Sequence, residues 1–87
     1  MVIKLADTKV GQVDHYYDRV GAVTLSLEND LSVGDHIKIV SGENELIQEV
    51  YSIEIDHQKV AQAKKGDQIG LKVDQPVKIK SVIYKVS

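Results

Sequence analysis

The sequence predicts an all-β fold, a small domain in which short antiparallel strands close into a barrel. Hydrophobic residues make up 43% of the 87 residues, valine and isoleucine dominate among them, and phenylalanine and tryptophan are absent. β-Branched side chains have restricted χ1 rotamers and pack well on a pleated surface, so this composition favours strands. Apolar and polar residues alternate with a period of two along most of the chain, whereas helical periodicity is almost absent.

The alternation is clearest in five segments, residues 23–28, 37–39, 68–73, 77–80 and 82–86. The last of these sets Val82, Tyr84 and Val86 against Ile83 and Lys85. Short strands joined by short turns, without crossover helices, pair mostly antiparallel. Closure of six or seven such strands into a barrel removes the exposed sheet edges that would otherwise promote aggregation.

Two segments depart from the simple alternation. Between Leu46 and Ile55 the apolar residues change parity, and one extra residue near Tyr51 and Ser52 would restore the register, so we expect a β-bulge there. Residues 60–65 are the one helical candidate, a turn or two in length.

Two Gly-Asp pairs, 32 residues apart, precede alternating segments. Gly34-Asp35 comes directly before Ile37 and Ile39, and Gly66-Asp67 precedes Ile69 and Leu71 in the same way. Glycine permits a positive φ and an aspartate carboxylate can bond nearby backbone amides. Each pair therefore predicts a tight turn that leads into a strand.

Length and composition limit the domain organisation and the compartment. We expect residues 1–87 to form one domain, because a chain of this length supports one hydrophobic core. Without cysteine there is no disulfide framework or thiolate zinc site. No segment approaches the length of a membrane span or has the apolar core of a secretory signal, so we expect a cytoplasmic protein with no membrane partner. Residues 1–8 either add a strand or fray.

The residue patterns do not predict an enzyme, and we expect no catalytic residues, no cofactor, no metal and no DNA specificity. The chain lacks the glycine-rich loop ending in Gly-Lys-Ser/Thr that cradles phosphates, and it has no Gly-x-Ser-x-Gly setting for a nucleophilic serine. His15, His36 and His57 do not have the short spacing that prepares a pair of metal ligands. Asp14, Asp18, Glu54 and Asp56 could supply paired carboxylates, but such side chains are mostly solvated charges.

Four motifs, taken in order and spacing, resemble a known barrel. They are residues 10–17 (VGQVDHYY), residues 21–23, residues 31–37 with the first Gly-Asp pair, and residues 63–71 with the second. Together they resemble the second-domain barrel of the translation elongation factor Tu superfamily, above all its small free-standing elongation-factor-like proteins, and the similar barrel appended to collagenase-like peptidases. The resemblance covers a core of residues 9–86. It implies a six-stranded closed antiparallel Greek-key barrel that binds RNA ends or neighbouring protein domains and performs no chemistry.

The resemblance also implies a binding pocket. Glu54 falls where the family has a pocket glutamate, and Gly66 and Asp67 fall in the turn that lines the pocket for the aminoacylated end of transfer RNA. His57 stands at an arginine position of the family and Asp56 at an aromatic one. These departures remove a permanent charge and a stacking ring, which argues against transfer RNA binding in the same manner.

Aromatic and basic residues supply the remaining candidates for a binding surface. His15, Tyr16, Tyr17 and Arg19 gather three rings and a guanidinium that could stack on unpaired bases, unless Tyr16 or Tyr17 instead fills one end of the barrel. Residues 57–87 contain seven lysines and two aspartates, whereas residues 1–56 contain four basic and eleven acidic side chains. Either the lysines, among them Lys64, Lys65, Lys78 and Lys80, form one basic face, or they neighbour acids of earlier strands.

Two functions remain open from the sequence. The chain is expected to be a non-catalytic binding module related to translation factor barrels and associated with RNA or the ribosome. The alternative is a protein-interaction module that acts as a separate subunit of a larger enzyme or complex.

Overall fold

The fold consists of antiparallel β-strands, as the alternation predicted. We describe residues 7–86 of a computed structural model. These residues form ten strands, eight in one sheet and two in a small separate pair. The strands are β1 (Thr8–Tyr17), β2 (Ala22–Ser26), β3 (Leu31–Ser32), β4 (His36–Ser41), β5 (Asn44–Glu49), β6 (Ile53–Ile55), β7 (Gln58–Val60), β8 (Gln62–Ala63), β9 (Gln68–Lys72) and β10 (Val82–Val86). The question of a further strand before Thr8 falls largely on residues outside the described range.

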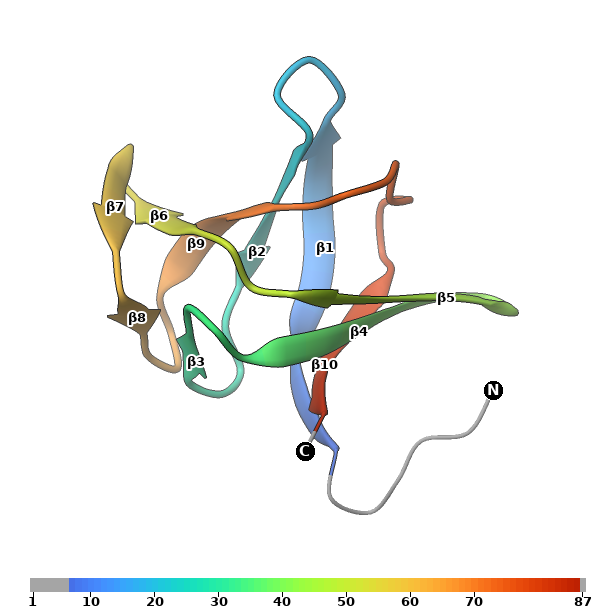
Figure 1. Ribbon diagram of the computed structural model, residues 1–87, viewed down its shortest axis with the longest axis horizontal. Coiled ribbons are helices and arrows are strands. Elements are labelled where there is room, and N and C mark those ends of the chain that lie inside the picture. Colours follow the sequence, from blue (N-terminus) through green and yellow to red (C-terminus); the bar gives the residue numbers. More distant parts are fainter. Residues whose placement is uncertain (1–6, 87) are drawn as a thin grey trace.

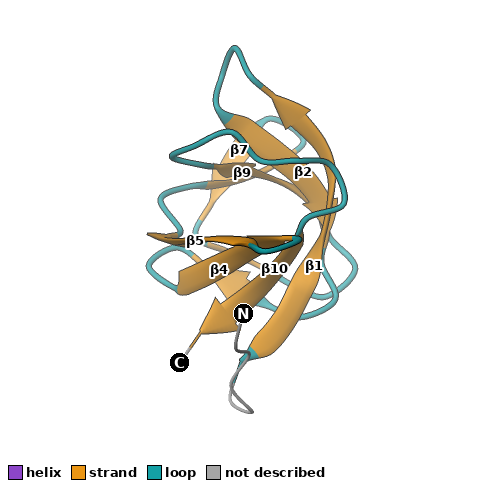
Figure 2. Ribbon diagram, turned by 90° about the vertical axis from the view of Figure 1, so that its right-hand side faces the viewer, coloured by secondary structure: helices purple, strands orange, loops and turns teal. Residues whose placement is uncertain are grey.

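Strand β1 lies at the centre of the sheet and belongs to both of its halves (Figure 1). On one side of β1 follow β10, β4 and β5, and on the other side follow β2, β9, β6 and β7. The sheet curls so that the two halves face each other, as the side view in Figure 2 shows. Every strand pairing in the described part of the chain is antiparallel.

Two bulges allow β1 to serve both halves. The register shifts once between Lys9 and Gly11, where β1 pairs with β10, and again between Val13 and His15, where it pairs with β2. A bulge bends a strand and increases its twist. At Gly11 the neighbouring chain comes very close, since a Cβ atom there would lie 2.6 Å from the backbone oxygen of Ser26. Only glycine fits this approach without displacing the backbone.

The prediction of a closed barrel of six strands is wrong. Strands β5 and β7 end the eight-stranded order, and no ladder joins them within residues 7–86. The chain leaves β5 at Glu49 and re-enters the sheet beside β9 at Ile53. The parity change predicted near Tyr51 and Ser52 is therefore real, but it marks this passage between the two halves and not a bulge.

A buried glutamine bridges the gap between the halves. The Gln48 side chain on β5 donates to the carbonyl oxygens of Lys72, at 2.9 Å, and Glu49, at 3.1 Å. Its Oε1 atom accepts from the backbone N–H of Asp74 at 2.9 Å. Gln48 is only 7% exposed. One side chain thus supplies the polar contacts that a continuous ladder would supply in a closed barrel.

The two Gly-Asp turns are confirmed, and they resemble each other in detail. Gly34 and Gly66 have φ angles of 98° and 95°. The N–H groups of Asp35 and Asp67 donate to the carbonyl oxygens three residues earlier, and a glycine with positive φ before the last residue is typical of a type II turn. Each aspartate carboxylate accepts from the backbone N–H three residues before it, at 2.9 Å for Asp35 and 2.8 Å for Asp67. Strands β3 and β8, which precede the turns, pair with each other.

Three local predictions are wrong. Residues 60–65 form no helix, because β8 within them pairs with β3. Residues 77–80 form no strand: Pro76 lacks a donor, Lys80 has a φ of 74°, and the Lys78 carbonyl accepts from the N–H of Ser81 in a turn. In β10 the buried residue is Ile83, which lies opposite Ile39 of β4 and Gly11 of β1. The core-facing side of β10 is therefore that of Ile83, and not the side of Val82, Tyr84 and Val86.

The core consists of aliphatic side chains from both halves of the sheet, and Tyr16 packs against it. Leu25, Leu31, Ile37, Ile53 and Ile83 are among the largest fully buried side chains. Branched aliphatic residues of this size fill the narrow space between the halves. Within residues 7–86 there is no helix long and apolar enough to cross a membrane.

We predict that Gln48→Leu lowers the free energy of unfolding by about 1–3 kcal/mol, because it removes the partner of the Lys72 carbonyl and the Asp74 N–H in two partly buried hydrogen bonds. Urea unfolding measures the change. Gln62→Leu, the same substitution at an exposed position of β8, is the control and should change stability by less than about 0.5 kcal/mol. Equal losses in both variants would show that Gln48 does not bridge the halves.

Candidate functional site

A groove of about 530 Å³ lies on the half of the sheet that contains β2, β9 and β6. Its walls come from the end of β1, the β1–β2 hairpin and the β6–β7 turn. The lining residues are Tyr17, Val20, Ala22, Thr24, Glu54, Asp56, His57, Gln68, Ile69, Gly70, Leu71 and Lys72.

Strand register places Gly70 on the floor of this groove. Gly70 on β9 pairs with Thr24 on β2 and with Glu54 on β6, so the three residues lie in one row across the sheet. A Cβ atom at Gly70 would find its nearest neighbour, the Cβ of Glu54, at 3.9 Å. The missing side chain therefore leaves a depression between a hydroxyl and a carboxylate.

The rim of the groove contains a strained turn. Asp56 and His57 are the two residues between Ile55 and Gln58, which pair at the end of the β6–β7 hairpin. Their φ angles are 52° and 66°. A two-residue hairpin loop with two positive φ angles is a type I′ turn, for which Asn-Gly is preferred. A non-glycine residue with such a positive φ carries a conformational cost of order 1 kcal/mol or more. Strained residues of this kind are frequent at functional sites.

The aromatic residues predicted as a binding surface divide between core and surface. Tyr16 packs against the core, as the alternative interpretation expected, whereas Tyr17 is 48% exposed and lines the groove. The rings of His15 and Tyr17 lie next to each other, with centroids 4.8 Å apart and planes tilted by 45°. Arg19 lies in the turn between β1 and β2 and is exposed.

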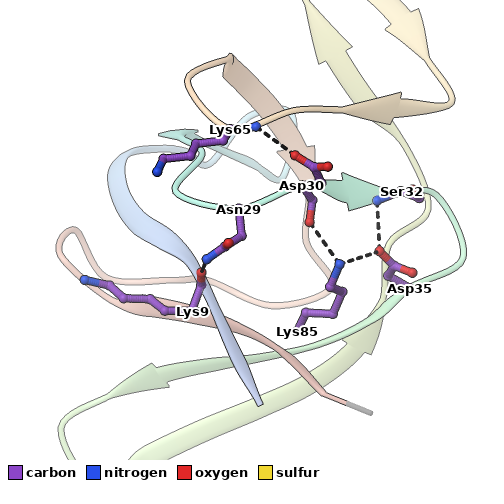
Figure 3. Close-up of polar contacts among 7 residues, drawn as sticks. All are labelled: Lys9, Asn29, Asp30, Ser32, Asp35, Lys65 and Lys85. Carbon is purple, nitrogen blue, oxygen red and sulfur yellow. Dashed lines mark hydrogen bonds and ion pairs between the residues drawn. The ribbon is translucent and has the colours of Figure 1, made fainter. Parts of the chain in front are cut away.

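The lysines of the last third lie in several places, and some contact acids or carbonyl oxygens. Lys85 is 3.9 Å from the Asp35 carboxylate and donates to the Asp30 carbonyl oxygen at 3.0 Å (Figure 3). Lys64 and Lys65 form part of the second Gly-Asp turn, and the N–H of Lys65 donates to the Asp30 carboxylate. Earlier in the chain, Lys9 pairs with Glu28 at 3.3 Å.

Nine of the twelve predicted site residues do not line the groove, among them Lys78, Lys80, Gly66 and Asp67. Lys78 lines a smaller groove of about 290 Å³ on the other half of the sheet, and Lys80 follows it in the turn before β10. Gly66 and Asp67 do not line the 530 Å³ groove, because their backbone bonds to Leu27. The structure therefore brings together Tyr17, Glu54 and His57, and it separates them from the lysines predicted to accompany them.

Several groove residues were missed by sequence reasoning. Thr24, Gly70 and Lys72 were read as ordinary positions of alternating strands. The strand register that aligns Thr24 and Gly70 with Glu54 depends on pairing between distant segments, which one sequence does not reveal. The isolated glycine inside the β9 pattern was the available signal, since such a glycine often marks close approach or open space.

Two observations concern the titratable groups of residues 7–86. Residues 7–86 contain no group of three His, Asp or Glu side chains placed to hold a metal ion. The Tyr51 hydroxyl donates to the Asp74 carboxylate at 3.0 Å, and this hydrogen bond raises the pKa of the Tyr51 phenol above its usual value of 10.0. Tyr51 lies outside the groove, between β5 and β6.

Comparison with known proteins relates the chain to one domain of a peptidase. Two crystal structures of the C-terminal domain of a Geobacillus thermoleovorans putative U32 peptidase have the same fold. One superposes with a TM-score of 0.83 at 18% identity over 100% of both chains. The other, a selenomethionine variant, has a TM-score of 0.82 at 20% identity and covers 88% of this chain and 98% of that domain. No family model matches the sequence.

A curated relative points in the same direction. An uncharacterized protease of Methanocaldococcus jannaschii is 32% identical over 82 residues. The match covers 93% of this chain but only 20% of that protein, so the chain spans about a fifth of the relative's length. The peptidase part of the expected resemblance thus agrees with these findings, while the elongation factor part stays a prediction.

We predict that His57→Gly raises the free energy of unfolding by about 1 kcal/mol, because glycine adopts the positive φ of the turn without strain. Urea unfolding measures it. His36→Gly makes the same chemical change within β4 and should destabilise the protein, since glycine weakens a strand. A loss of stability in both variants would contradict the strained turn.

Proposed function

We propose that this chain is a non-catalytic docking module that binds a protein partner, as an accessory domain or separate subunit of a larger peptidase-related assembly. The observation that supports the proposal most strongly is the fold match: the whole chain superposes on one domain of a putative peptidase. A domain of this kind in a larger protein has neighbours to contact. The part of the relative that this chain does not cover is where the peptidase chemistry would belong.

The surface of the groove supports docking to protein. Tyr17 and Val20 are large apolar residues, 48% and 57% exposed, and both lie on its wall. Tyrosine is enriched at the centres of protein interfaces, because it combines a large apolar ring with a hydroxyl. The groove thus combines an apolar wall with polar groups on its floor and opposite rim.

A photo-crosslinking experiment in cells tests the docking function. With p-benzoylphenylalanine in place of Tyr17, we expect irradiation to yield an adduct that survives nuclease treatment and is removed by protease. The same residue in place of Ile79, which is 57% exposed but does not line the groove, is the control and should yield little adduct. Equal adducts from both positions, or none from Tyr17, would contradict docking at the groove.

RNA binding is a second candidate function, supported by the neighbouring rings of His15 and Tyr17. Exposed rings can stack on bases, at about 1–3 kcal/mol per base. The ion pairs of Lys9 and Lys85 weaken the case for one continuous phosphate-binding face.

If RNA is the partner, Tyr17→Ala should lower the affinity for a single-stranded oligonucleotide about tenfold or more, as the lost stacking energy implies. Fluorescence anisotropy at low and at physiological salt measures it, and the affinity should fall as salt rises. Tyr51→Ala, at an exposed tyrosine outside the groove, is the control. An affinity that is undetectable or independent of salt would contradict RNA binding.

A further inference from the structure

The groove has room for one flat side chain above Gly70. Thr24 and Glu54 border this position on the neighbouring strands, and the position itself carries no side chain. Two strand spacings, or roughly 9–10 Å, separate β2 from β6 across β9. That width admits a planar group lying between the two side chains, and it is too narrow for a folded segment of chain.

Two of the polar groups around the groove are already engaged. The Lys72 ammonium donates to the carbonyl oxygen of Val20 at 3.0 Å. The Gln68 side chain accepts from the Ser26 hydroxyl at 2.5 Å and donates to the Asp14 carboxylate at 3.2 Å. These contacts hold the cation and the amide against the protein's own atoms.

Apart from the His57 imidazole and the Tyr17 hydroxyl, which can also donate, the remaining polar groups are mainly hydrogen-bond acceptors. Glu54 and Asp56 contribute carboxylates, Thr24 contributes a hydroxyl, and neither carboxylate forms an ion pair within the described residues. Lys59 lies opposite Glu54 on β7 but does not line the groove. Two carboxylates against one engaged ammonium give the groove an excess of negative charge. A complementary ligand therefore carries positive charge and several N–H donors.

Tyr17 further limits which cationic group suits the groove. Its ring stands at the wall of the groove and is held beside the ring of His15. The face of an aromatic ring attracts a cation, and a planar guanidinium stacks on it better than a compact ammonium does. A guanidinium also offers five N–H donors in a fixed plane, which suits carboxylate acceptors.

We propose that the groove binds an arginine side chain of the protein partner, with the guanidinium above Gly70 between Glu54 and Thr24 and stacked against Tyr17. This proposal rests on the docking function and specifies its chemistry. The partner would present the arginine from its surface, and the groove would recognise it by charge and by shape.

Titration of the ¹⁵N-labelled protein with N-acetyl-arginine amide tests the proposal, followed in ¹H–¹⁵N correlation spectra. We expect saturable shifts of the amide signals of Thr24, Glu54 and Gly70. N-acetyl-citrulline amide has the same shape without the charge, and its affinity should be lower by a factor of about ten or more. Glu54→Gln should lower the affinity for the arginine probe to that for the citrulline probe. Glu45→Gln removes an exposed carboxylate on β5 outside the groove and should leave the affinity for the arginine probe unchanged.

A second variant tests the shape of the groove without changing its charge. Gly70→Leu places a side chain where the guanidinium would lie, and it should abolish the shifts. Gly70→Ala, whose Cβ would make only an ordinary contact of 3.9 Å, shows whether this position accepts a side chain without unfolding. Retained arginine binding in a folded Gly70→Leu protein would overturn the proposed position.

Other outcomes would overturn the recognition itself. Equal shifts with the arginine and citrulline probes would show that the groove does not recognise positive charge. Shifts of the His57 and Lys72 amide signals with inorganic phosphate alone would show that the groove is an anion site. An adduct from position 17 without a response to the arginine probe would leave docking intact and reject the guanidinium. A response to the arginine probe without any protein adduct would instead reject docking.

Discussion

The whole architecture depends on one strand that belongs to both halves of the sheet. Strand β1 pairs with β10 along its first part and with β2 along its second, and a bulge in each part turns the strand from one half to the other. Gly11 permits the backbone of Ser26 to approach at this bend. The two halves therefore cannot shift relative to each other without breaking ladder hydrogen bonds of β1, and the core between them is fixed in thickness.

The groove follows from this arrangement. Tyr17 is the last residue of β1, so the strand that joins the halves also delivers the aromatic wall. The paired β3 and β8 place the second Gly-Asp turn directly before β9, which sets the register that brings Gly70 between Thr24 and Glu54. The acidic rim comes from the hairpin that continues from β6. Residues distant in sequence thus meet because the register of β2, β9 and β6 aligns Thr24, Gly70 and Glu54 in one row across the sheet.

Local chemistry made part of this predictable. The alternation over residues 23–28 and 68–73 and the glycines at 34 and 66 have direct physical meanings, and they were interpreted correctly. The buried face of β10 was predicted wrongly, because Ile83 and its neighbours are all apolar or long. Pairing with β4 and β1 decides which of them is buried. Of the candidate site, Tyr17, Glu54 and His57 were named in advance. Their grouping with Gly70 depends on the pairing of β2, β9 and β6, which no local pattern encodes.

The open edge of the sheet at β5 has a consequence for the isolated domain. This strand ends the order on its side of β1, and Ile47 on it is 63% exposed. No strand of residues 7–86 pairs with the outer side of β5, and an unpaired edge with an exposed isoleucine is a template on which another chain can add a strand. Glu43, Glu45 and Glu49 lie within four residues of that isoleucine in the sequence, and two copies paired edge to edge along β5 would bring carboxylates together. Their repulsion opposes self-association, and it weakens as acid neutralises them or salt screens them.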